Sequence, residues 1–123
     1  YSRGAILVWM GRAEEGTAVL ETSHRFDPSL DNAMLPMGYY LQRRYRDAVA
    51  AADARIARNP EVNFVRAVRV AALGQLGEIE EAGRAVEELR RRAPFVRAEN
   101  FGLNLRKPED VARLHEGLRK AGL

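Results

Sequence analysis

The stretch that decides the fold runs from Leu73 to Pro94 and reads LGQLGEIEEAGRAVEELRRRAP. Its apolar residues recur at helical spacing and therefore fall on one face of an α-helix. They are Ile79, Ala82, Val86 and Leu89. Acidic residues stand in the first turn and three arginines in the last, as the helix dipole favours. A proline then ends the helix, because the residue before a proline avoids the α region. These signals predict a helix over 78–92.

The same arrangement recurs upstream. Pro28, Pro60 and Pro94 lie 32 and 34 residues apart, and twelve residues before each stands a small residue. The small residues are Gly16, Ala48 and Ala82. Periods of this length are typical of stacked supersecondary units. We expect helices over 2–10, 12–26, 29–42, 45–58, 61–75 and 78–92. Pro36 falls inside the third of these and should kink it, unless it lies in the first turn.

The blocks resemble tetratricopeptide repeats, in which each unit is a pair of antiparallel helices. The family pattern has a small residue closing the turn, an aromatic two positions later, an alanine three further on and a final proline. Its counterparts here are Gly77, Ile79, Ala82 and Pro94, then Tyr45, Ala48 and Pro60, and, more weakly, Gly11, Ala13, Gly16 and Pro28. In the first helix of the third unit, Arg66, Arg69 and Val70 stand where the family has tryptophan and Leu-Gly. The resemblance implies an all-α, right-handed superhelix, with two and a half to three hairpins over 1–94.

The period stops after Pro94. Residues 95–106 read FVRAENFGLNLR and mix aromatics with Gly and Asn, so we expect a helical turn and a loop. Residues 107–123 read KPEDVARLHEGLRKAGL and predict a last helix, because Pro108 suits a first turn and Gly122 can end it. A stack of repeats has open ends. We therefore expect 95–123 to form a connecting loop and a C-terminal capping helix.

The ending carries a second resemblance. Two phenylalanines after the last repeat, a Pro-Glu-Asp helix start and the terminal GLRKAGL resemble the tails of certain bacterial proteins. These proteins pair a class III adenylate or guanylate cyclase domain with C-terminal tetratricopeptide repeats. Similar tails follow winged-helix transcription regulators. The chain begins at Tyr1, so we expect a fragment whose catalytic domain would lie upstream.

The resemblance implies a non-catalytic protein–protein interaction or regulatory scaffold module on a cyclase-like signalling protein. The same module on a winged-helix transcriptional regulator is one alternative, and an all-α nucleic-acid-binding domain is another. Nucleic-acid binding calls for a continuous basic stripe. The net charge of +3 arises from 20 basic residues interspersed with 17 acids, which favours a protein or peptide partner instead.

The composition of the chain bears on disulfide bonds, thiolate chemistry and membrane insertion. The chain has 123 residues, enough for one domain, and its lack of cysteine excludes disulfides and thiolate chemistry. No apolar run approaches the ~20 residues that span a bilayer. We therefore expect a cytoplasmic protein without a membrane partner. The longest apolar run is residues 5–10, AILVWM. If a preceding unit is missing, this segment should pair with a second copy and form a homodimer.

No catalytic, cofactor or metal site is expected. His24 and His115 lie far apart in sequence. His24 shares its repeat position with Ile56, which predicts a partly buried structural histidine, and His115 should have a surface or capping role. No His-x-x-x-His spacing or acid-rich glycine loop is present, and GQLGE at 74–78 lacks the Lys-Ser/Thr of a phosphate loop.

The resemblance places a binding groove on the first helix of each pair, which lines the inner surface of the family's superhelix. The candidate partner-binding residues are Trp9, Leu30, Ala33, Met37, Tyr40, Phe64, Ala67 and Ala71. Aromatic and methionine side chains beside small ones suit a peptide or helix. The alternative is that half of these residues are core. The carboxylate-clamping subtype is disfavoured, because the two lysines, Lys107 and Lys120, both lie after the repeats.

Overall fold

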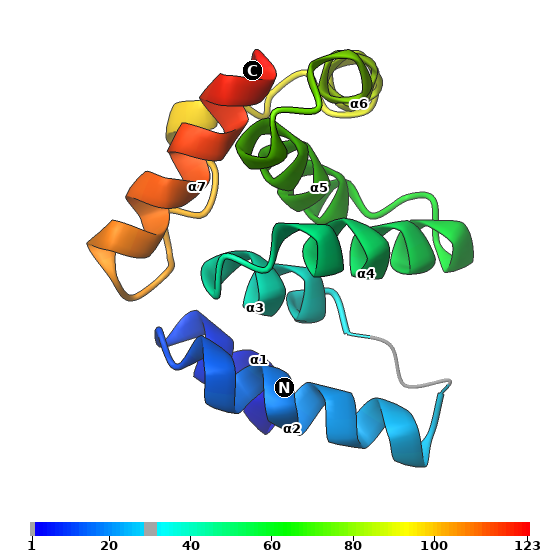
Figure 1. Cartoon of the computed structure of the whole chain (residues 1–123), viewed down its shortest axis with the longest axis vertical. Helices are drawn as coiled ribbons and strands as arrows, with labels where there is room; N and C mark the ends of the chain where they lie inside the picture. Colours follow the sequence, from blue (N-terminus) through cyan, green and yellow to red (C-terminus); the bar gives the residue numbers. More distant parts are fainter. Residues whose placement is uncertain (1, 29–31) are drawn as a thin grey trace.

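A computed structural model describes residues 2–28 and 32–123. Within these ranges the chain is helical and contains no strand, so the predicted all-α class is confirmed (Figure 1). The helices are α1 (Arg3–Trp9), α2 (Ala13–Phe26), α3 (Met34–Leu41), α4 (Tyr45–Arg58), α5 (Asn63–Leu76), α6 (Ile79–Arg92) and α7 (Pro108–Ala121), with a short 3-10 helix η1 (Ala98–Asn100). Consecutive helices pack as the pairs α1/α2, α3/α4 and α5/α6.

The turn inside each pair has the same hydrogen bonds. A residue with positive φ follows the first helix, namely Gly11, Arg43 or Gly77. The N–H of this residue donates to the carbonyl oxygen three positions earlier in the chain. The N–H of the residue that follows it donates to the carbonyl oxygen five positions earlier. This pair of bonds is the Schellman motif. Helices α2, α4 and α6 are each 14 residues long and start 32 and 34 residues apart. The three pairs therefore share one register.

Helix α3 is shorter than predicted. It begins at Met34, whose N–H donates to Asn32 Oδ1 at 2.8 Å, and residues 29–31 lie outside the described ranges. Pro36 is consequently the third residue of the helix. The first four N–H groups of a helix have no intrahelical acceptor, so the proline removes no helical bond there. The expected mid-helix kink is therefore avoided.

The small residues of the repeat allow the helices of a pair to approach closely. A Cβ on Gly16 would lie 2.6 Å from the carbonyl oxygen of Gly4, so α1 and α2 are in backbone contact. Ala48 and Ala82, at the same register position, are fully buried. The core also contains large side chains from every part of the chain. Leu73, Leu89, Leu114 and Leu118 are at most 2% exposed, and burying a leucine contributes about 1.5–3 kcal/mol.

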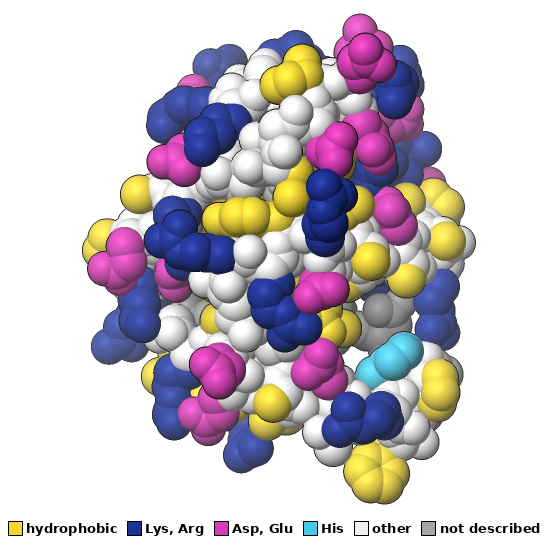
Figure 2. Space-filling model, in the orientation of Figure 1, with side chains coloured by type: hydrophobic (Ala, Val, Ile, Leu, Met, Phe, Trp, Pro, Cys, Tyr) yellow, Lys and Arg dark blue, Asp and Glu magenta, His cyan; other side chains and the backbone are white. Residues whose placement is uncertain are grey.

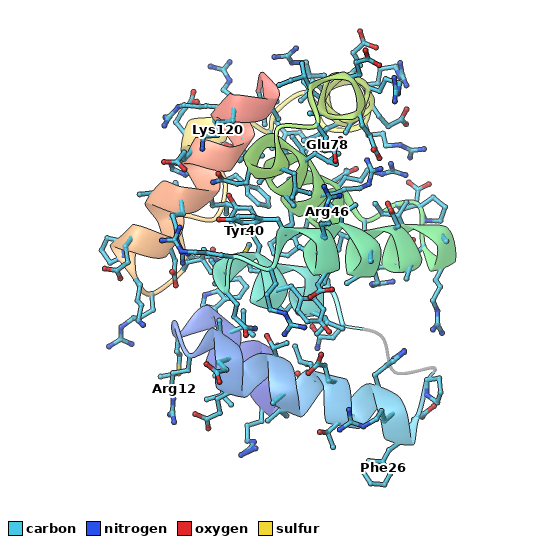
Figure 3. All side chains as sticks on the ribbon, in the orientation of Figure 1. Arg12, Phe26, Tyr40, Arg46, Glu78 and Lys120 are labelled. Atoms are coloured by element: carbon cyan, nitrogen blue, oxygen red, sulfur yellow. The ribbon has the colours of Figure 1, made fainter. Side chains whose placement is uncertain are left out.

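Helix α7 forms where the sequence predicts it and packs along α5 (Figure 1). It also reaches α3, because the Tyr40 hydroxyl donates to the Arg113 carbonyl oxygen at 2.7 Å and Arg113 Nη2 donates to the Leu41 carbonyl oxygen at 3.0 Å. Figure 3 shows Tyr40 directed into the space between these helices. Helix α7 therefore packs along α5 and contacts the C-terminal end of α3.

Candidate functional site

The predicted inner groove is largely interior. Met37, Tyr40, Ala67 and Ala71 have no exposed surface. They are core residues, and the prediction that these four line a partner-binding groove is corrected accordingly. Trp9, Ala33 and Phe64 are partly buried, and Leu30 lies outside the described residues.

The chain's own C-terminal residues cover this surface. The ring of Phe101 packs against that of Phe64, with centroids 5.4 Å apart. A Cβ on Gly117 would lie 2.6 Å from the Ala71 carbonyl oxygen. Farther along, the Arg106 N–H donates to the Trp9 carbonyl oxygen at 3.0 Å. Segment 95–107 and α7 thus take the place that the resemblance gives to a ligand.

The two histidines have different roles. His115 Nε2 lies 2.8 Å from the Phe101 carbonyl oxygen and links α7 to the segment that precedes it. The expectation that His24 is partly buried is wrong, since its side chain is exposed. Ile56, at the equivalent position of the next pair, is partly buried. Long side chains of α5 and α6 line the space beside Ile56, whereas alanines of α4 line the space beside His24.

An open groove lies between α2 and α4, next to α3. We call it the first groove. Its volume is about 470 Å³, and Figure 2 shows a hollow in this part of the molecule. It is lined by Ser2, Leu20, Ser23, His24, Asn32, Leu35, Pro36, Tyr39, Asp47, Ala50, Ala51 and Ala54. Most of this lining is apolar or small.

The equivalent space between α4 and α6, the second groove, is filled differently. It has a volume of about 300 Å³ and is lined by Asp53, Ile56, Arg66, Arg69, Glu81, Arg84, Ala85 and Glu88. Arg69 donates through Nε to Asp53 at 2.6 Å and through Nη2 to Glu81 at 2.5 Å. One arginine of α5 therefore links the two helices that flank it.

The register explains why the first groove is open. Leu35, Ala50 and Ala54 occupy the positions of Arg69, Arg84 and Glu88, so three long charged side chains are replaced by shorter, apolar ones. The acids are retained: Glu21 stands at the position of Asp53, and Asp47 at that of Glu81. The first groove thus has the acidic positions of the second without its central arginine.

Tyr39 connects Asp47, which lines the first groove, with Glu21, which lies beside the groove on α2. Its hydroxyl donates to Glu21 Oε2 at 2.5 Å. The guanidinium of Arg44 lies 4.6 Å from the centre of its ring, and Arg44 Nε donates to Asp47 Oδ2 at 2.9 Å. Burial, followed by the hydrogen bond to Glu21, raises the pKa of Tyr39 to about 12. The phenol is therefore a neutral donor at physiological pH.

A second exposed apolar surface lies on α1. Ile6 and Met10 are each 44% exposed, and with Ala5 and Trp9 they line a shallow depression of about 290 Å³. This is the surface for which the sequence predicts pairing with a second copy, and that pairing stays a prediction.

Other site types find little support in the described ranges. Basic and acidic side chains are interspersed on the face that Figure 2 displays. No three His, Asp or Glu side chains of residues 2–28 and 32–123 come together as metal ligands. In the same residues, none of the helices has the length and apolar character needed to cross a bilayer. No family model matches the chain, and searches of curated proteins and of solved structures find no match either.

Proposed function

We propose that this chain is a non-catalytic protein-interaction module of the tetratricopeptide type, which holds a segment of a partner protein in the first groove. The observation that carries the proposal is the substitution of Leu35, Ala50 and Ala54 for the charged side chains that fill the second groove. Apolar, concave surface of this kind is what a helix or peptide buries on binding. The inner face, by contrast, is already covered by segment 95–107 and α7.

The setting proposed for this module follows from the resemblance of its tail. It would act as a regulatory scaffold in the bacterial cytoplasm, attached to a cyclase-like signalling domain. A module of the same kind on a winged-helix transcriptional regulator would use the same groove, since the groove is built from the repeat and not from the tail.

Selection from a displayed library of helical peptides tests the proposed function. The double variant Ala50→Arg/Ala54→Glu introduces the residues of the second groove into the first, a combination that this repeat already accommodates at 84 and 88. Peptides enriched on the unmodified chain should lose binding to this variant. They should keep binding to Ala18→Glu/Ala57→Arg, which carries the same added charges at two exposed positions outside the groove. Enriched peptides that bind all three proteins equally, or no enrichment, would reject the proposal.

A further inference from the structure

We infer that the first groove recognises an arginine side chain supplied by the partner, and seats it as the second groove seats Arg69. This inference rests on the proposed protein-binding function and specifies the chemistry of the partner. The two grooves share one register and differ in whether an internal arginine is present.

The second groove shows how an arginine is held. The Arg69 side chain is 20% exposed, while its two partners Asp53 and Glu81 are 55% and 46% exposed. The aliphatic stem thus lies between α4 and α6, and the guanidinium reaches one carboxylate on each helix. A planar guanidinium offers donors in several directions and can serve two acids at once, which a lysine ammonium does less well.

Asp47 lines the first groove, and Glu21 lies beside it on α2, bound to the lining residue Tyr39. Glu21 accepts one hydrogen bond at Oε2 and Asp47 accepts one at Oδ2. Within residues 2–28 and 32–123, the second oxygen of each carboxylate makes no further hydrogen bond or ion pair. Arg44 is the cation already present, and it holds Asp47 through one oxygen only from a side chain that is 44% exposed. Two acids beside the groove, one on α2 and one on α4, each keep one oxygen without a partner in the described residues, and they favour a cation although the whole chain is basic.

The floor of the first groove suits the rest of an arginine side chain. Leu35 lies at the position from which Arg69 enters the second groove, so no internal stem occupies the space. Ala50 and Ala54 leave room on α4 for an incoming stem and for the backbone that bears it. Arginine buries its methylene groups along apolar surface while its charged end stays hydrogen-bonded. The predicted ligand is therefore an arginine on a helical segment with neighbouring aliphatic residues.

Three synthetic peptides test this inference on the full chain. Each is a short, capped, alanine-rich helix with two leucines, and they differ only in carrying arginine, lysine or citrulline, the neutral isostere of arginine. Titration with the arginine peptide should shift the backbone amide NMR signals of Leu20, Ala50 and Ala54. Replacing arginine by citrulline should weaken binding by roughly tenfold or more, because a charge-assisted pair becomes neutral. The affinity of the lysine peptide should lie between those of the arginine and citrulline peptides.

Variants of the protein separate this inference from the proposed function. Glu21→Gln and Asp47→Asn should each abolish most of the preference for arginine over citrulline. Glu14→Gln should preserve it, because Glu14 is an exposed acid in the first turn of α2. Circular dichroism checks that each variant is folded. If all three peptides bind equally and shift the groove signals, arginine recognition is overturned and the proposed function stands. Shifts confined to α1 or to segment 95–107, or no binding by any peptide, would overturn the inference, and the display experiment then decides the proposed function.

Discussion

Gly74 and Gly117 bring the backbones of α5 and α7 into contact. A Cβ on Gly74 would lie 2.1 Å from the carbonyl oxygen of Gly117, closer than non-bonded atoms approach. Gly74→Ala should therefore push α7 away from α5 and lower the free energy of unfolding by about 1–3 kcal/mol, as overpacking does. Urea denaturation followed by circular dichroism measures the change.

Gly83 provides the matched control. It lies within α6 and is exposed, and a Cβ added to it would meet no neighbouring side chain or helix within 4 Å. Gly83→Ala should stabilise the protein by about 0.5–1 kcal/mol, because glycine in a helix interior is unfavourable relative to alanine. Equal effects of the two substitutions would mean that the α5–α7 contact does not depend on the missing Cβ.

The Tyr40 hydroxyl is a second link to α7. It donates to the Arg113 carbonyl oxygen and accepts from Gln75 Nε2 at 3.1 Å. Tyr40→Phe should lower the free energy of unfolding by about 1–2 kcal/mol, since buried partners lose a hydrogen bond. Tyr45 packs edge-on against Tyr40 at 5.1 Å, and its hydroxyl has no hydrogen-bond partner within the described residues. Tyr45→Phe should therefore change stability by less than about 0.5 kcal/mol, and a loss as large as that of Tyr40→Phe would contradict the assignment.

Alkaline pH should destabilise the fold through Tyr39 and Tyr40. Burial raises the pKa of Tyr39 to about 12 and raises that of Tyr40 as well. An unfolded tyrosine has a pKa of about 10, so above that pH the folded state binds more protons than the unfolded state. This stabilisation is complete below about pH 10 and is lost as the pH rises through the pKa values that the two tyrosines have in the folded state. Urea titrations at increasing pH should show a shallower decline for Tyr40→Phe than for the unmodified chain, and parallel declines would refute this.

The Arg69 bridge should stabilise the protein measurably. Arg69→Met keeps the apolar stem and removes the guanidinium, leaving Asp53 and Glu81 without their cation. The expected loss is about 1–2 kcal/mol, decreasing with added salt. Arg46 is the control, because its 3.3 Å bridge to Glu78 joins α4 to the start of α6 from a side chain that is 76% exposed (Figure 3). Arg46→Met should cost less than about 0.5 kcal/mol, and the prediction fails if the two losses are equal.

The apolar surface of α1 should support weak self-association. Sedimentation velocity should show a dimer fraction that increases with concentration, and Ile6→Lys/Met10→Lys should abolish it, because burying the new charges at a dimer contact is unfavourable. Phe26→Lys is the control, since Phe26 is 87% exposed and projects from the far end of α2 (Figure 3). A monomer at every concentration, or a dimer that persists in the double variant, would remove α1 as the interface.

Much of the fold could be predicted from the sequence, because the signals that bound the second helix of each pair are local. The predicted helices 45–58 and 78–92 agree with α4 and α6 to within one residue. The predicted start of α3, by contrast, lies too early in the chain. Asn32, which accepts a hydrogen bond from the Met34 N–H, and the first-turn Pro36 mark the true start, whereas the prediction followed the repeat register, which places a helix directly after Pro28.

The candidate site was harder to predict, since it depends on contacts between distant residues. Repeat register places Met37, Tyr40, Ala67 and Ala71 on one surface, but nothing local to them indicates that Phe101 and α7 will cover it. The first groove did have a sequence signal. Comparing Ala50 with Arg84 at equivalent positions reveals the loss of bulk, although only the structure shows that the resulting space stays open.

The link between Arg106 and Trp9 has a consequence for biosynthesis. In an open array of repeats, each unit can fold once its neighbour has left the ribosome. Here the C-terminal ends of α1 and α3 lack their final contacts until residues beyond position 100 emerge, since Arg106 contacts Trp9 and Arg113 contacts Tyr40, which lies 73 positions earlier. Long-range closure of this kind slows folding and leaves apolar surface exposed for longer. Nascent chains stalled before α7 should therefore be recognised by chaperones, and released only when translation supplies the missing cover.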